Sequence, residues 1–265
     1  MSSSPVRIEV GGDGVAELIL ARPQSRNALN RAMTDEMARH LKAFDEDPAV
    51  RVVLLRADGD HFAAGADLKE LAGLTFEQAV QMDFTGSCDA MEGFRKPIVT
   101  AVQGYALGGA CEIVEMSDIV IADENAVFGH PEVRVGTMPG AGGTQRLPRI
   151  VGMTRALDLL LTGRQIDAHE ALDWGLVSRV VAAGTLLSEA RRLAGEMAAL
   201  PTRVQAVIKA AARATARTTL DEGLRLERDA FHASLAAPEW LEGSSAFLGR
   251  RPPNFRACAD AVQEN

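Results

Sequence analysis

The chain has 265 residues, of which 47% are hydrophobic, 24% charged and 5% aromatic, and this composition excludes a disordered chain, collagen and fibres. Its formal charge of −8 disfavours a broad contact with nucleic acid or with an anionic membrane, because both repel an acidic surface. We therefore expect neither as a partner.

Strands and helices alternate in the first part of the chain. Residues 6–10 and 15–20 alternate in polarity around a glycine cluster and predict a β-hairpin, which a helix with apolar residues from Met33 to Phe44 follows. Short apolar runs predict buried strands at 52–55, 98–102 and 119–122, with a short helix over 109–116. Strands separated by helices indicate parallel pairing and an α/β fold.

The last third of the chain has a different pattern. From Thr144 onward it is helical, with one further strand expected within 176–181 and no strand pattern after Pro201. We therefore expect residues 1–200 to form the core with the ligand site, and residues 201–265 to form a separate helical region. Four apolar residues in this region share one helix face: Leu220, Leu224, Phe231 and Leu235. We expect this face to pack on the chain's own core, with a contact between subunits as the alternative.

Three cysteines, Cys88, Cys111 and Cys258, lie far apart and form no C-x-x-C pair, which predicts reduced thiols in a cytoplasmic protein and no zinc site. The first residues contain no apolar segment of signal-peptide length. The longest uncharged run, Pro97 to Cys111, is shorter than the roughly 18 residues of a membrane span. We expect no metal and no membrane insertion.

Two segments are richer in small residues than a core requires. His61 to Lys69 follows one predicted strand, Gly104 to Glu112 follows another, and each leads into a helix. Backbone N–H groups at a helix start carry partial positive charge, and small side chains let a ligand oxygen approach them. Either segment alone is ordinary turn chemistry. Two such turns on neighbouring parallel strands can direct two amides at one oxygen, as in an oxyanion hole.

Ordered motifs along almost the whole chain resemble the crotonase, or enoyl-CoA hydratase/isomerase, superfamily, and enoyl-CoA hydratase in particular. They begin with R-P-Q-S-R-N-A-L-N (22–30), F-A-A-G-A-D-L-K (62–69) and G-Y-A-L-G-G-A-C-E (104–112), and continue with F-G-H-P-E (128–132), G-T-M-P-G-A-G-G-T-Q-R-L (136–147) and S-A-F-L-G-R-R-P-P-N-F (245–255). The resemblance implies a crotonase-like spiral of repeated β-β-α units with a C-terminal helical region used in oligomerisation. It also implies an acyl-CoA thioester substrate, no cofactor besides the coenzyme A of that substrate, and a homotrimer or a homohexamer made of two trimers.

The resemblance also assigns the site. The oxyanion amides would be those of Ala66 and Gly109, and the catalytic carboxylates those of Glu112, as the base, and Glu132, as the acid, with the roles open to exchange. Without the motif context, Glu112 would be interpreted as an acid that interacts with a helix N-terminus, and Glu132 as an acid in a surface turn. Positions matching the coenzyme A and acyl contacts are Arg26, Ala28, Ala64, Asp67, Leu68, Gly140 and Arg250, with Arg22 as a further candidate cation, although a single arginine is more often a solvated charge. Asp67 has an alternative role as a helix cap.

Three residues near these motifs need separate interpretations. Ala110 stands where a third glycine is common, which leaves both amides in place. Glu115 is an extra acid one turn after Glu112, and we expect it to be structural or exposed. His130 has no partnered nucleophile motif, so we interpret it as a loop histidine.

The function expected from these features is the syn addition of water to a 2-trans-enoyl-CoA by a hydro-lyase. Two alternatives stay open. A Δ3,Δ2-enoyl-CoA isomerase would use the same oxyanion hole with one carboxylate, and an idle acyl-CoA-binding scaffold would need neither carboxylate.

Overall fold

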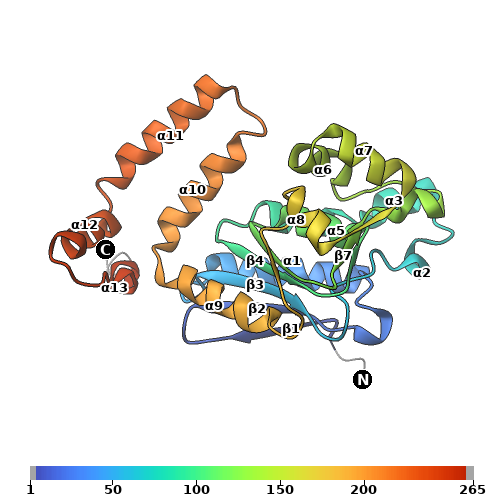
Figure 1. Ribbon diagram of the computed structural model, residues 1–265, viewed down its shortest axis with the longest axis horizontal. Helices are drawn as coiled ribbons and strands as arrows, with labels where there is room; N and C mark the ends of the chain where they lie inside the picture. Colours follow the sequence, from blue (N-terminus) through green and yellow to red (C-terminus); the bar gives the residue numbers. More distant parts are fainter. Residues whose placement is uncertain (1–3, 261–265) are drawn as a thin grey trace.

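The computed structural model describes residues 4–260, which form two β-sheets with helices around them (Figure 1). The strands are β1 (Val6–Val10), β2 (Val15–Leu20), β3 (Val52–Ala57), β4 (Ile98–Val102), β5 (Tyr105–Leu107), β6 (Ile119–Asp123), β7 (Val127–Gly129), β8 (Gln165–Asp167) and β9 (Arg179–Val181). The α-helices are α1 (Arg31–Glu46), α2 (Leu68–Leu71), α3 (Phe76–Met82), α4 (Asp89–Glu92), α5 (Gly109–Met116), α6 (Gly143–Val151), α7 (Met153–Thr162), α8 (Ala168–Asp173), α9 (Leu186–Ala199), α10 (Thr202–Ala214), α11 (Leu220–Ser234), α12 (Pro238–Leu248) and α13 (Phe255–Asp260). Three 3₁₀ turns complete the list: η1 (Pro23–Ser25), η2 (Gly86–Cys88) and η3 (Pro131–Val135).

The chain winds through repeated β-β-α units. A strand enters the six-stranded sheet, ordered β1-β2-β3-β4-β6-β9, and the chain then turns into a second sheet, ordered β5-β7-β8. The unit β4, β5 and α5 is the clearest example. The segment after β3 also reaches the second sheet, because Ala63 forms an isolated parallel bridge with Ala106 of β5. All pairs from β2 to β9 in the large sheet are parallel, and the β1–β2 hairpin is antiparallel. The expected hairpin and α/β class are confirmed.

Helices cover both faces of the large sheet. Met33, Met37 and Leu41 of α1 are buried in the main core, on the side of the sheet that also holds Val53 and Leu55. Leu186, Ala190 and Leu193 of α9 pack in a second cluster with the residues of β3 that alternate with these, Val52 and Leu54. A strand that is buried on both faces needs apolar residues at every position, which explains its continuous apolar run.

The small sheet was missed by the sequence analysis. Its strands β5, β7 and β8 have three residues each, which is too short for a recognisable period. The strand expected within 176–181 exists as β9 but starts only at Arg179.

The helices that follow Pro201 extend away from the sheets (Figure 1). Ion pairs hold the start of this region to the core: the Lys209 ammonium lies 2.7 Å and the Arg213 guanidinium 2.8 Å from the Asp118 carboxylate. The apolar face of α11 does not pack on the core, because Leu220 and Phe231 are 77% and 57% exposed and Leu224 and Leu235 are also exposed. The expectation of core packing was therefore wrong. No helix within the described range combines the length and hydrophobicity of a membrane-spanning segment.

Candidate active site

The two turns rich in small residues lie side by side. The Ala63 N–H donates a hydrogen bond to the Tyr105 carbonyl at 2.8 Å, and the Leu107 N–H donates to the Ala63 carbonyl at 3.2 Å. A Cβ atom added at Gly65 would lie 3.0 Å from the Leu107 carbonyl oxygen. The chain around Ala66 therefore runs directly against the turn that leads into α5.

Two backbone amides at this contact have no acceptor among the described residues. Gly109 is the first residue of α5, where an N–H group has no partner within the helix. Within residues 4–260, neither the Gly109 nor the Ala66 N–H donates a hydrogen bond, whereas the neighbouring Asp67 N–H donates to the Leu29 carbonyl at 2.7 Å. Two amides from adjacent loops are thus available to a ligand oxygen.

Glycine is required at two positions of these turns. Gly65 has φ +98°, and Gly108 has φ +53° with ψ −127°. L-residues other than glycine rarely adopt these backbone conformations. A Cβ at Gly108 would also lie 2.9 Å from the Glu132 Oε1 atom. The glycine is what lets the amide turn and the Glu132 carboxylate approach each other.

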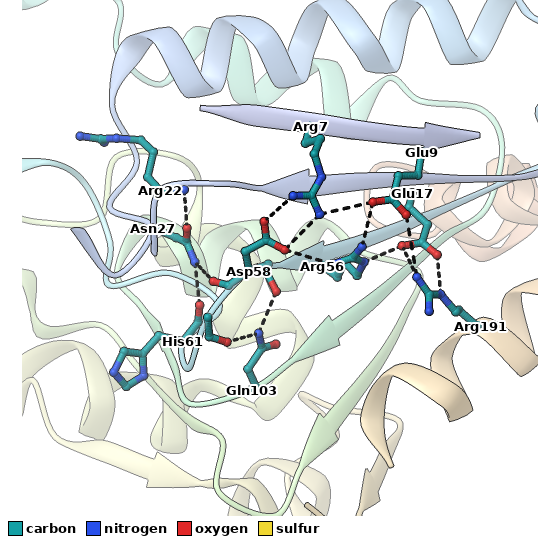
Figure 2. Close-up of polar contacts among 12 residues, drawn as sticks. Arg7, Glu9, Glu17, Arg22, Asn27, Arg56, Asp58, His61, Gln103 and Arg191 are labelled. Carbon is teal, nitrogen blue, oxygen red and sulfur yellow. Dashed lines mark hydrogen bonds and ion pairs between the residues drawn. The ribbon is translucent and has the colours of Figure 1, made fainter. Parts of the chain in front are cut away.

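Asn27 fastens the loop that carries Ala66 (Figure 2). Its side chain is fully buried, donates to the carbonyls of Asp58 and His61 at 2.8 Å each, and accepts from the Arg22 N–H at 2.8 Å. The Gln103 side chain holds the same loop through the Ala57 and Gly59 carbonyls. Asn27 itself has φ 52°, a strained conformation that asparagine tolerates better than most residues.

Glu112 is held in one orientation by the start of α6. Its side chain lies in the first turn of α5, and its Oε1 atom accepts the Ala141 N–H at 2.8 Å and the Gly143 N–H at 2.7 Å. Burial raises the pKa of Glu112 above its ordinary value, while the Gly143 amide, His130 and the Ala141 amide act in the opposite direction. A carboxylate with a raised pKa and a fixed orientation can act as a proton acceptor.

Glu132 reaches the same place from η3. Pro131 begins this turn, and its fixed φ angle sets the direction in which the chain enters it. The carboxylate is 14% exposed, and its Oε1 atom lies beside Gly108 and 3.8 Å from the His130 Nδ1 atom.

The two carboxylates flank the Gly108–Gly109 turn. Glu132 Oε1 is 2.9 Å from the position that a Cβ at Gly108 would take, and Glu112 Oε2 is 3.9 Å from the corresponding position at Gly109. The structure therefore brings Ala66, Gly109, Glu112 and Glu132 together. Such a site can hold an oxyanion on the amides while two carboxyl groups move protons beside it.

Glu115 is structural and His130 lies in a loop, as expected, but their pairing with each other was not expected. Glu115 is buried, not exposed, and the His130 loop side chain is fully buried, with its Nε2 atom 2.7 Å from the Glu115 Oε1 atom. Helix α5 is buried almost all round, so an acid on any of its faces needs a partner. That pattern was the available signal for this pair.

A metal ion does not fit this pair and its neighbour Cys111. Ligand atoms of the three residues lie within 4.8 Å of one another, the one such group in the described part of the chain. The direct Glu115–His130 hydrogen bond already occupies the space between two of them, and burial raises the pKa of the Cys111 thiol, so it is protonated at neutral pH. We interpret the three residues as a hydrogen-bonded cluster.

The residues expected around coenzyme A gather near the Ala66 loop. The Ala64 N–H donates to the Arg26 carbonyl at 3.0 Å, and Ala28 accepts a hydrogen bond from the Arg22 side chain. Asp67 caps α2 and also pairs with Arg22 at 3.1 Å, so the charge of Arg22 is already engaged. Arg26 and Leu68 are exposed beside them: both can contact a ligand at the surface.

Two other expected residues lie elsewhere. Gly140 is exposed in the segment before α6, close to Thr85 and one residue from the Ala141 amide that holds Glu112. Arg250 follows α12, which lies at the opposite end of the molecule from α2 (Figure 1). The structure therefore does not bring Arg250 to Arg26 within one chain, because the C-terminal helices extend away from the core.

Known proteins are similar to this chain in both sequence and fold. The sequence profile of the enoyl-CoA hydratase/isomerase family matches residues 11–258. A protein named probable enoyl-CoA hydratase in Rhizobium meliloti is 44% identical over 97% of this chain and 99% of its own length. A second, in Mycobacterium leprae, is 44% identical over 92% of this chain and 95% of its own.

The fold agrees with the sequence match. The crystal structure of an enoyl-CoA hydratase from Bacillus anthracis superposes with a TM-score of 0.91 and 34% identity, over 95% of this chain and 99% of that one. The expected crotonase-like spiral with C-terminal helices is thereby confirmed. The chain belongs to the enoyl-CoA hydratase/isomerase family.

Proposed function

We propose that this protein is an enoyl-CoA hydratase, which adds water in a syn fashion to a 2-trans-enoyl-CoA and yields the 3-hydroxyacyl-CoA. The observation that carries the proposal is the placement of two carboxylates, from Glu112 and Glu132, on either side of the turn that offers the Gly109 amide. The names of the relatives support the same activity.

The amides would act on the thioester oxygen. As water attacks C3, the C2–C3 double bond and the carbonyl become an enolate, and negative charge collects on that oxygen. The N–H groups of Ala66 and Gly109 would bind this charge, each contributing about 3 kcal/mol by analogy with other oxyanion holes. The substrate needs no separate cofactor for this step, because the coenzyme A thioester itself stabilises the carbanion.

The carboxyl groups would move the two protons. The water oxygen bonds to C3 and gives one proton to the Glu112 carboxylate, while a protonated Glu132 gives its proton to C2. The proton on Glu112 then returns to Glu132 through solvent, which restores the starting state. The raised pKa of Glu112 makes it a stronger base than an ordinary glutamate.

Crotonyl-CoA tests this proposal against its alternatives. Hydration removes the ultraviolet absorbance of the conjugated enoyl thioester and gives a product heavier by one water. An isomerase would instead increase that absorbance when supplied with a 3-enoyl-CoA. An idle scaffold would bind the ester and change neither signal. Loss of turnover in Glu112→Gln and Glu132→Gln, against an unchanged exposed control, His169→Gln, would assign the hydration to this site.

The proposal includes a homotrimer or a dimer of trimers built through the C-terminal helices. The exposed apolar side chains of α11 support it, as does an apolar cavity of about 500 Å³ lined by Trp240, Phe247 and Phe255. Light scattering on a size-exclusion column would test it. A monomer at micromolar concentration would contradict this part of the proposal alone.

A further inference from the structure

A buried pair of titratable residues lies directly behind the two acids. Glu115 follows Glu112 by one turn of α5, and His130 precedes Glu132 by two residues. Both side chains have no exposed surface, and their 2.7 Å hydrogen bond links α5 to the segment that enters η3. The pair thus connects the two elements that carry the acids.

The other nitrogen of the histidine faces Glu132. The His130 Nδ1 atom lies 3.8 Å from Glu132 Oε1 and makes no hydrogen bond within the described residues. Glu132 Oε2 is also buried there without a partner. A small rotation of either side chain would turn the 3.8 Å approach into a hydrogen bond.

The imidazole ring also supports the loop that holds Glu112. A Cβ at Gly143 would lie 2.8 Å from His130 Cε1 and 3.2 Å from Glu112 Cγ, so this glycine is enclosed between the two side chains. The Gly143 amide is one of the two donors to Glu112. One ring therefore lies against both halves of the site.

The charges around His130 favour a doubly protonated ring. Burial alone would lower its pKa, but the hydrogen-bonded Glu115 carboxylate and the nearby Glu132 carboxylate raise it. Since Cys111 stays a thiol, the carboxylates are the groups that hold the proton. The other charged groups facing the cluster are Glu112 on α5 and Arg146 on α6.

We propose that Glu115 and His130 act as a positioning pair for Glu132: Glu115 holds the imidazolium through Nε2–H, and Nδ1–H orients the Glu132 carboxyl group that carries the proton destined for C2. This role rests on the proposed function, because it concerns the acid of the hydration step. When Glu132 releases its proton, the imidazolium stabilises the carboxylate that forms. A pair that served packing alone would gain nothing from charge, since burying charged groups is costly.

Kinetics of three variants test the pair: His130→Gln, Glu115→Gln and the double variant. For His130→Gln we expect kcat to fall about 10-fold or more, with KM changed less than about 3-fold. The exposed His169→Gln variant is the control and should match the wild type.

Glu115→Gln gives an independent prediction. Without the Glu115 charge, His130 should lose its second proton near its ordinary pKa of about 6.5, which adds an ionisation to the kcat–pH profile. The double variant should lack this ionisation and be no slower than His130→Gln alone, because paired groups do not act additively. If His130→Gln does not fold, Glu115→Gln decides the question on its own.

The protonation state has a readout independent of turnover. The ¹⁵N shifts of labelled imidazole should show a doubly protonated buried ring in the wild type at about pH 7.5, and a titrating ring in Glu115→Gln. A neutral ring in the wild type, or a Glu115→Gln kcat–pH profile that superimposes on the wild-type profile, would overturn the pair's role. A wild type that leaves crotonyl-CoA unchanged would instead refute the proposed function.

Discussion

Replacing Glu112 by glutamine should make the protein slower and more stable at once. The amide oxygen of glutamine can still accept the Ala141 and Gly143 N–H groups, so the side chain should keep its place. The variant loses the base, which is worth about 10² to 10⁴ in rate, or roughly 3 to 5 kcal/mol. We expect kcat to fall within that range and the affinity for a CoA ester to change little.

The gain in stability follows from the direction of the pKa shift. Burial raises the pKa of Glu112 in the folded protein, so the fold binds this proton more tightly than the unfolded chain does. The free energy of unfolding therefore falls as pH rises from the unfolded pKa of about 4.3 through the folded pKa, and the loss persists at neutral pH. Glutamine removes that loss. One pKa unit corresponds to about 1.4 kcal/mol, or roughly 3 to 6 °C in Tm for a chain of this size.

Thermal unfolding between about pH 4.5 and pH 8 measures this effect. The Tm difference between Glu112→Gln and the wild type should grow with pH, while the exposed Glu227→Gln control should show no trend. A variant that is several degrees less stable at pH 8, with turnover lost in proportion to folded protein, would mean that the Glu112 carboxylate is structural. That result would refute its assignment as the base.

Three further predictions concern the rest of the site. Glu132→Gln should lower kcat about 100-fold or more with an unchanged CoA-ester affinity by calorimetry, and near wild-type turnover would remove the acid role. Gly108→Ala should lower kcat at least about 10-fold because its Cβ meets Glu132. Gly184→Ala should not, because Gly184 also has a positive φ (+83°) but a Cβ there would meet open space. Equal losses of kcat in the two variants would contradict this reasoning. Asn27→Ala removes the partner of three partly buried backbone groups and should lower the free energy of unfolding in urea by about 2 kcal/mol or more, together with kcat. An unchanged kcat would show that Asn27 does not hold the Ala66 loop.

The parts of this protein that sequence reasoning predicts well are those that repeat a simple pattern. Helix α5 begins and ends at the predicted residues, and the parallel strands follow from runs such as Val52 to Leu55. The strand and turn order also predicts that the two glycine-containing segments lie next to each other, as the hydrogen bonds between them confirm. In each case the signal is local: a strand buried on both faces requires a continuous apolar run, and a tight turn requires a glycine, so both can be recognised within a few residues.

What sequence reasoning missed depends on contacts between distant residues. The Glu115–His130 hydrogen bond and the Asn27 contacts with Asp58 and His61 join segments that have no shared pattern. The exposed face of α11 was wrongly placed in the core, since an apolar stripe has the same sequence whether it packs within the chain or against another surface.

One turn accounts for the compactness of the site. Because Gly108 has no side chain, the chain can bend into α5 so that the Gly109 amide lies at a helix start, with Glu112 one turn later. The same missing Cβ leaves room for Glu132 to approach from η3, and the missing Cβ of Gly143 lets α6 hold Glu112. Both carboxylates therefore depend on a glycine for their position: Glu132 on Gly108, and Glu112 on Gly143. Any residue larger than glycine at position 108 would push Glu132 away and strain the turn that directs the amide, so we expect a change there to impair proton transfer and oxyanion binding together.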